Sequence, residues 1–183
     1  MNREQAYEEL TERLKAVNLV KHSLAVEAIM KRLAEILKED EEKWGLAGLL
    51  HDIDLDRVGN DMTKHSLAGA EILEDIGVDS SVVYAVRAHN SYHGIIRRRM
   101  IDKALFCSDP VSGLITAAAL ILPSKKLNDV TPDFILRRFN ESAFAKNVSR
   151  EQILECNELG LSLELFIETA LNAMKEISGD LGL

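Results

Sequence analysis

Apolar residues recur every three or four positions along most of this chain, which is the spacing of one face of an α-helix. Segments that alternate strictly between apolar and polar residues, as half-buried strands do, are few. The three prolines are Pro110, Pro123 and Pro132, so the chain before and after this stretch is free of the residue that most disrupts helices. The pattern therefore predicts an all-α fold.

Apolar stripes, capping residues and glycines divide the chain into predicted helices and loops. The stretch 44–53 is almost continuously apolar and predicts a buried helix that ends at His51-Asp52, whereas 54–63, with Gly59, Asn60 and Asp61, predicts a loop. A first helix is predicted from the stripe Leu10, Leu14 and Val17, and a second over 24–37. Further helices are predicted over 64–76, from 79 or 80 to about 89, over 95–108 and over 110–122. One more starts at Thr131-Pro132, and a long final helix is opened by the capping box 149–152 and carries apolar residues to Met174.

The chain shows neither an internal repeat nor a Gly/Ser-rich linker. Its 183 residues suit one hydrophobic core. We therefore expect a single domain over 1–183, with a compact core at about 18–122 and a helical extension at 131–178 that packs against it.

Composition narrows the classes of partner. The chain carries 30 acidic and 22 basic residues, a net charge of −8, which disfavours binding to a long nucleic acid. The apolar run 114–122 is too short to cross a membrane, and the charged first residues do not resemble a signal peptide. Cys107 and Cys156 are too few and too far apart for a disulfide framework, so we expect a cytoplasmic protein.

Five histidines carry the main chemical signal: His22, His51, His65, His89 and His93. The first four fall near the ends of predicted helices, Asp52 follows His51, and Asp109 precedes Pro110 at the expected junction of two helices. Helical bundles build metal sites from side chains that converge in this way, and imidazole with carboxylate suits divalent metals. Taken one by one, these residues have plainer explanations: surface or core histidines, a loop position for His93, and a helix cap for Asp109.

The order of these residues resembles the HD-domain metal-dependent phosphohydrolases. The matching segments are Lys21-His22-Ser-Leu-Ala-Val26, Leu46-Ala-Gly-Leu-Leu-His51-Asp52-Ile-Asp54 and Phe106-Cys-Ser-Asp109. The segments 64–73, with His65, and 86–90, with His89, are similar to those of the HDIG subgroup. The resemblance covers about 20–118 and implies an HD-type helical bundle with additional C-terminal helices.

The resemblance also implies a ligand set for one or two divalent ions. His22, His51, Asp52 and Asp109 would hold one ion, and Asp52 would bridge to a second ion held by His65 and His89. Two departures stand out: Asp54-Leu55-Asp56 replaces the Gly and Lys that the subgroup usually has, and His89 lacks an adjacent histidine, which leaves His93 as a candidate to complete the second site. The residues do not choose among iron, manganese, nickel, cobalt and zinc.

The activity implied is hydrolysis of a phosphoester or phosphoanhydride by metal-activated water. Asp52 would act through the metals, and Asp56 or His93 would protonate the leaving group. Lys64, Arg87 and Arg97, the first of three consecutive arginines, are candidate phosphate-binding residues, although such charges often only solvate a helix face. The acidic chain favours a small phosphorylated substrate, with a nucleotide as the foremost expectation.

Two other functional classes stay open. Some proteins that resemble this ligand set hold a di-iron centre that activates oxygen, and some relatives of the fold are non-catalytic helical binding modules. The final predicted helix, with Leu163, Phe166, Ile167 and Leu171, offers a surface for a homodimer, although packing within the chain is the simpler use of it.

Overall fold

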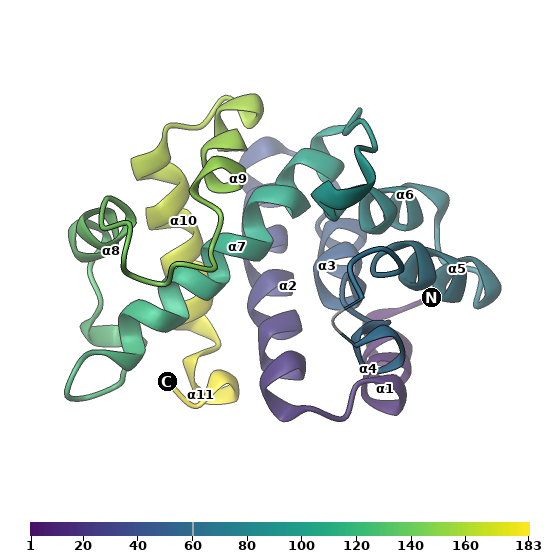
Figure 1. Ribbon diagram of the computed structural model, residues 1–183, viewed down its shortest axis with the longest axis horizontal. Helices are drawn as coiled ribbons and strands as arrows, with labels where there is room; N and C mark the ends of the chain where they lie inside the picture. The colour runs from purple at the N-terminus through teal and green to yellow at the C-terminus, as the bar shows by residue number, and fades with distance from the viewer. Residues whose placement is uncertain (60) are drawn as a thin grey trace.

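The computed structural model describes residues 1–59 and 61–183, and within these the regular elements are all helical (Figure 1), which confirms the all-α prediction. The α-helices are α1 (Arg3–Arg13), α2 (Val17–Leu37), α3 (Glu41–Leu50), α4 (Leu55–Val58), α5 (Leu67–Asp75), α6 (Ser80–His89), α7 (Met100–Leu120), α8 (Pro132–Phe139), α9 (Arg150–Leu154), α10 (Leu163–Glu176) and α11 (Ser178–Leu181). Short 3₁₀ helices are η1 (Ser91–His93), η2 (Leu127–Asp129) and η3 (Glu155–Leu159).

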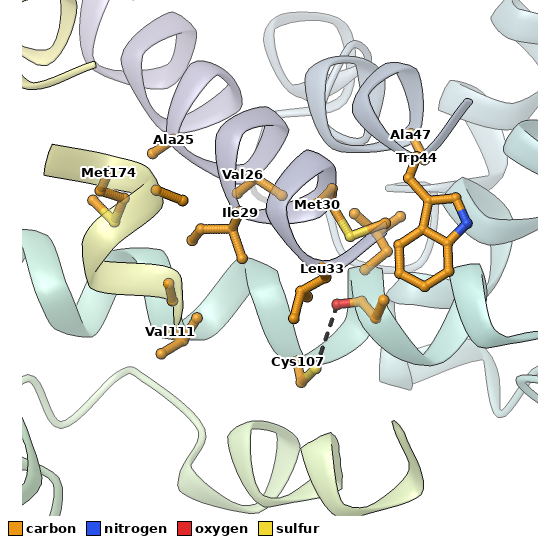
Figure 2. Packing of buried hydrophobic residues seen from close by; sticks show 14 of the residues in the cluster. Ala25, Val26, Ile29, Met30, Leu33, Trp44, Ala47, Cys107, Val111 and Met174 are labelled. Carbon is orange, nitrogen blue, oxygen red and sulfur yellow. Dashed lines mark hydrogen bonds between the residues drawn. The ribbon is translucent and has the colours of Figure 1, made fainter. Parts of the chain in front are cut away.

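The long helix α2 runs through the middle of the bundle. In Figure 1, α1 and α3 to α6 lie on one side of α2, α8 to α11 lie on the other, and α7 spans both halves. Figure 2 shows the resulting core, in which Met30 of α2 lies on the side of Trp44 in α3, while Ile29 of α2 lies on the side of Met174 in α10 and Val111 in α7. Burial of these apolar side chains is the main stabilising term for the bundle.

A glycine allows α2 and α3 to approach closely. A Cβ atom on Gly48 of α3 would lie 2.8 Å from backbone atoms of Val26 and Glu27 in α2, a separation that real Cβ atoms do not adopt. Any larger residue would therefore push the helices apart. The contact matters for function because His51 directly follows α3 and faces His22 of α2.

The predicted break at Pro110 is wrong, since α7 continues from Met100 to Leu120 with Pro110 inside it. Proline removes the hydrogen bond that residue 110 would donate to the Phe106 carbonyl, at a cost of roughly 3 kcal/mol. Extensive burial of α7 offsets this cost, because its faces contact α2, α6 and the C-terminal helices. Asp109 therefore lies in the middle of a helix and caps none.

The predicted start of this helix at Ile95 is also wrong. A carboxylate sets the real boundary, because Oδ2 of Asp102 accepts the backbone N–H groups of Arg98 and Arg99 at 3.0 and 2.9 Å. These donors would otherwise lack partners at the helix start. The helix therefore begins at Met100, and residues 94–98 are not helical.

Other boundaries differ for local reasons. Val17 was expected in the first helix, but it starts α2. The predicted loop over 54–63 contains the short helix α4, and Asn60 of that loop lies outside the described residues. Residues 64–66 form a turn before α5. The predicted long final helix is divided into α9, η3 and α10, because the chain turns at Gly160 and the side chain of Ser162 caps a new helix.

The C-terminal helices pack against α2 and α7, and their large apolar residues belong to the same buried cluster as those of the first half. Of the four residues of the expected dimer surface, Phe166, Ile167 and Leu171 are fully buried within the chain itself and Leu163 is partly buried. The domain boundaries and the homodimer stay predictions. None of the helices in the described ranges has both the length and the apolarity that crossing a membrane requires.

Candidate metal centre

Imidazole rings and carboxylates from five parts of the chain meet at one point. They come from α2, the turn after α3, the turn before α5, the end of α6 and the middle of α7. The residues brought together are His22, His51, Asp52, His65, His89 and Asp109. All six positions predicted as metal ligands therefore converge.

Asp52 lies at the centre of this cluster, and its two oxygens face different pairs of imidazoles. Oδ2 is 3.6 Å from Nε2 of His22 and 3.2 Å from Nε2 of His51. Oδ1 is 3.5 Å from Nε2 of His65 and 3.6 Å from Nε2 of His89. A carboxylate oriented in this way is suited to bridge two cations.

Asp109 adds a second carboxylate beside the first imidazole pair. Its Oδ1 is 3.1 Å from Nε2 of His22 and 3.9 Å from Nε2 of His51, and these two nitrogens are themselves 3.2 Å apart. Ligand atoms of His22, His51 and Asp109 lie within 4.8 Å of one another, as do those of His51, Asp52 and His89. Both groups could hold a metal ion.

Hydrogen bonds to the other ring nitrogens orient the imidazoles. Nδ1 of His51 donates to the Gly48 carbonyl at 2.8 Å, and Nδ1 of His89 donates to the Val86 carbonyl at 2.6 Å. Because a carbonyl can only accept, the neutral rings must carry their proton on Nδ1 and keep the lone pair of Nε2 toward the cluster. Metal-binding histidines are commonly held in this tautomer by such a partner.

His22 is oriented by a serine. The Ser112 hydroxyl donates to the Asp109 carbonyl at 2.8 Å and lies 3.0 Å from Nδ1 of His22. Since the hydroxyl has a single hydrogen, it accepts the Nδ1–H of His22. Nε2 of His22 is thereby free to bind a cation. The sequence carried no signal for Ser112, because the contact joins residues 90 positions apart.

Asp54 orients His65 and was not predicted as a site residue. Its Oδ1 accepts from Nδ1 of His65 at 3.0 Å, and its Oδ2 accepts the backbone N–H groups of Ser66 and Gly69 at 2.9 and 3.0 Å. The Asp54 side chain is fully buried. Ser66 adopts a left-handed conformation with φ of 70°, which costs energy for a non-glycine residue and which these contacts maintain. An acidic residue directly after the apolar segment was the available signal, although in the sequence it stood only as a departure from the family pattern.

The cluster has the polar chemistry of a cation site. Nε2 of His89 is buried and has no hydrogen-bond partner among the described residues, which is costly for a polar atom. Four imidazole nitrogens and two carboxylates also form a donor set typical of borderline divalent metals. The residues present therefore fit a metal ion.

The charges of the buried pair His51 and Asp52 also favour a cation at this place. Burial by itself would lower the pKa of His51, but the charge and hydrogen bond of Asp52 outweigh it and raise this pKa to about 9. Burial would raise the pKa of Asp52, yet His51 and the other imidazoles hold it well below its usual range. The carboxylate is therefore ionised in the interior, where it attracts either a proton on His51 or a metal cation.

The cluster is accessible from one side. The side chains of His51, His65 and His89 are buried, whereas those of His22 and Asp109 are 23% and 33% exposed. A small molecule can therefore reach the cluster at the end formed by α2 and α7.

Three residues predicted to bind phosphate point elsewhere in the structure. Lys64 pairs with Asp61 at 3.0 Å, and Arg87 pairs with Glu74 at 2.8 Å. The Arg97 guanidinium binds both carboxylate oxygens of Glu155 and lies 3.6 Å from the centre of the Phe106 ring. Their roles toward a substrate stay predictions, and the geometry does not bring these residues into the cluster.

The two predicted proton donors also have other partners. Oδ2 of Asp56 accepts the backbone N–H of Lys15 at 2.6 Å. Nε2 of His93 lies 2.8 Å from the His65 carbonyl, which also accepts a hydrogen bond from the Asn90 side chain at 3.0 Å. His93 and Asn90 thus hold the backbone of His65 in place, and Asn90 was not predicted.

Comparison with known proteins agrees with this geometry. The model of the HD domain family matches residues 19–111. The chain is 30% identical over 152 residues to an uncharacterized protein of Methanocaldococcus jannaschii, covering 77% of this chain and 86% of that protein.

Ribonuclease Y proteins match over shorter shares of their length. The chain is 32% identical over 108 residues to ribonuclease Y of Chlorobaculum tepidum, covering 59% of this chain and 18% of that protein. It is 32% identical over 141 residues to ribonuclease Y of Fusobacterium nucleatum, covering 73% and 27%. The chain thus spans less than a third of either ribonuclease, and no solved structure matches it. On the match to the family model and the relative from M. jannaschii, the chain belongs to the HD-domain family, whose members are generally metal-dependent phosphohydrolases.

Proposed function

We propose that this protein is a metal-dependent phosphohydrolase that cleaves a phosphoester or phosphoanhydride of a small phosphorylated molecule, with a nucleotide as the foremost candidate. The observation that carries the proposal is the position of Asp52 between two pairs of imidazole nitrogens. His22, His51, Asp52 and Asp109 would hold one ion, and Asp52, His65 and His89 would hold a second.

Divalent ions at this place would supply Lewis acidity toward a phosphoryl group and lower the pKa of water. The protein's own contribution is positional. The carbonyls of Gly48 and Val86 fix the rings of His51 and His89, and Asp54 fixes His65. Such prior orientation is most of what a phosphoryl-transfer site asks of the protein, because the reaction needs little covalent chemistry from it.

The partly exposed side chains of His22 and Asp109 set the direction from which a phosphate reaches the cluster. The buried side, formed by His51, His65 and His89, excludes bulk water and strengthens the interaction of charges there. Asp56 and His93 stay the predicted donors of a proton to the leaving group, and Asp56→Asn and His93→Gln would test them separately.

A small substrate is favoured over a polymer by the net charge of −8. The ribonuclease names of several relatives make RNA the competing substrate. The matched region is a minor part of those proteins, so their activity does not transfer directly.

Metal analysis followed by a substrate screen tests the proposal. The protein would be stripped with a chelator and reloaded with manganese, iron or zinc. Phosphate release would be measured from p-nitrophenyl phosphate and from nucleoside mono-, di- and triphosphates, beside cleavage of a single-stranded RNA oligonucleotide. We expect metal-dependent release from small substrates, and His51→Ala should lose bound metal and hydrolysis together.

Each outcome bears on the proposal. Hydrolysis that survives intact in His51→Ala would overturn it. Cleavage of RNA alone would move the substrate to the polymer class, and oxygen uptake by the iron-loaded protein without phosphate release would favour the di-iron oxygenase. Loss of metal and activity in His51→Ala, with both retained in Asp75→Asn on the exposed end of α5, would support it.

A further inference from the structure

A cavity of about 500 Å³ adjoins the accessible side of the metal cluster. It lies between α2, α7 and the segment 178–183, and His22 belongs both to its lining and to the cluster. A molecule whose phosphoryl group reaches His22 and Asp109 would therefore extend into this cavity. Its size lies within the range of small-molecule sites, roughly 300–1,000 Å³.

The lining of the cavity is chemically simple. Apart from His22, Lys21 is the charged residue there, and no acidic side chain lines the cavity as far as the described residues go. The walls from α7 include the small residues Gly113 and Ala117, which leave room, and Thr116, which adds a hydroxyl. The cavity therefore carries a positive charge at Lys21 and is otherwise lined mostly by apolar or small residues.

Lys21 has an incompletely matched charge. Its Nζ donates to the backbone carbonyl of Leu181 at 2.8 Å, and within residues 1–59 and 61–183 it forms no ion pair with a carboxylate. Four other lysines do form such a pair among the described residues, for example Lys31 with Glu27 and Lys64 with Asp61. An anion is a stronger partner for an ammonium group than a neutral carbonyl, because the two opposite charges attract each other in addition to the hydrogen bond.

We propose that this cavity binds the non-reacting end of the substrate and that Lys21 binds a second anionic group there, a carboxylate or a phosphate. This inference rests on the proposed function, since the first anionic group is the phosphoryl group at the metal cluster. It makes the substrate class a molecule with two anionic groups. Lys21 is then a specificity-determining residue.

The segment 178–183 fits closely over Lys21. A Cβ atom on Gly182 would lie 2.8 Å from Nζ of Lys21, and the backbone of Gly182 has φ of 72°, in the region that favours glycine. Leu181 is buried, so its carbonyl is held beside the ammonium. An arriving anion would take the place of this carbonyl as the partner of Lys21.

Calorimetric binding to the metal-loaded full chain tests the inference with ligands that cannot be hydrolysed. Propylphosphonate has one anionic group, whereas 3-phosphonopropionate and propane-1,3-diphosphonate add a carboxylate or a second phosphonate at a similar length. We expect at least one of the latter two to bind roughly 10- to 100-fold more tightly than propylphosphonate, the range for a hydrogen bond to a charged group. Which of them binds tighter distinguishes a carboxylate from a phosphate as the natural second group.

Variants at Lys21 assign the effect. Lys21→Met should abolish the preference and leave the affinity for propylphosphonate unchanged, Lys21→Arg should keep most of it, and Lys146→Met, at an exposed position, should match the wild type. Equal affinity of the wild type for all three ligands, or a preference that survives in Lys21→Met, would overturn the inference.

Hydrolysis of p-nitrophenyl phosphate, which has one anionic group, reports on the proposed function separately. Activity without the binding preference would refute the role of Lys21 alone, and the preference without activity would refute hydrolysis alone.

Discussion

Asp54→Asn is the substitution that separates the two halves of the metal cluster most cleanly. Oδ2 of Asp54 accepts two backbone N–H groups, those of Ser66 and Gly69, so the amide oxygen of asparagine would take that position. The amide NH₂ would then face Nδ1 of His65, at the 3.0 Å separation that Oδ1 occupies now. Two donors cannot form a hydrogen bond, so His65 must move its proton from Nδ1 to Nε2 or rotate.

Either adjustment weakens His65 as a ligand, because Nε2 with a proton has no lone pair for a metal. Substitutions of groups that orient ligands typically cost about 10- to 100-fold in metal affinity. The first imidazole pair is oriented by Gly48 and Ser112 and has no contact with Asp54, so its affinity should not change. The expected result is one ion bound with wild-type affinity and a second bound about 10- to 100-fold more weakly.

Competition with a chromophoric chelator, together with elemental analysis, measures both affinities. Asp75→Asn, an exposed aspartate at the end of α5, makes the same chemical change outside the cluster and should behave as the wild type. If Asp54→Asn bound both ions with wild-type affinity while His65→Ala lost one ion, the hydrogen bond from His65 to Asp54 would not be what orients His65 for metal binding. Loss of both ions in a correctly folded Asp54→Asn protein would refute the separation into two halves.

Three further predictions follow from burial and charge. Gly48→Ala should destabilise the protein by roughly 1–3 kcal/mol through overpacking, seen as a lower melting temperature, whereas Gly179→Ala, with open space around it, should not. In chelator-treated protein, Asp52 outweighs burial and raises the pKa of His51 from 6.5 to about 9, so this pair stabilises the fold fully below pH 6.5 and less as the pH rises through 9. Urea unfolding should therefore give a lower free energy of unfolding at pH 10 than at pH 7. His51→Gln should remove this difference. Burial raises the pKa of the Cys107 thiol well above its usual value, so alkylation by iodoacetamide at pH 8 should be slow until the protein is unfolded, and rapid labelling of the folded protein would contradict its burial.

Local sequence was sufficient for the helices whose signals are local. The stripe through Leu24 and Leu37, the proline of Thr131-Pro132 and the Ser149 side chain that caps α9 each depend on neighbours within four residues, and helices form at all three places. The same reasoning failed at Pro110, because its local cost is outweighed by burial of α7, which involves helices far away in the chain.

The sequence by itself determined which residue types were available for a metal site and in what order, because the donor atom that each side chain offers depends on that residue alone. Only the tertiary structure decided that Asp52 turns one oxygen to each imidazole pair, that Asp54 and Ser112 select the tautomers, and that Arg97 pairs with Glu155 and not with the cluster. The physical reason is that these choices depend on distances between side chains of different helices. Such distances follow from how the helices pack, as at Gly48, and packing is a property of the whole core.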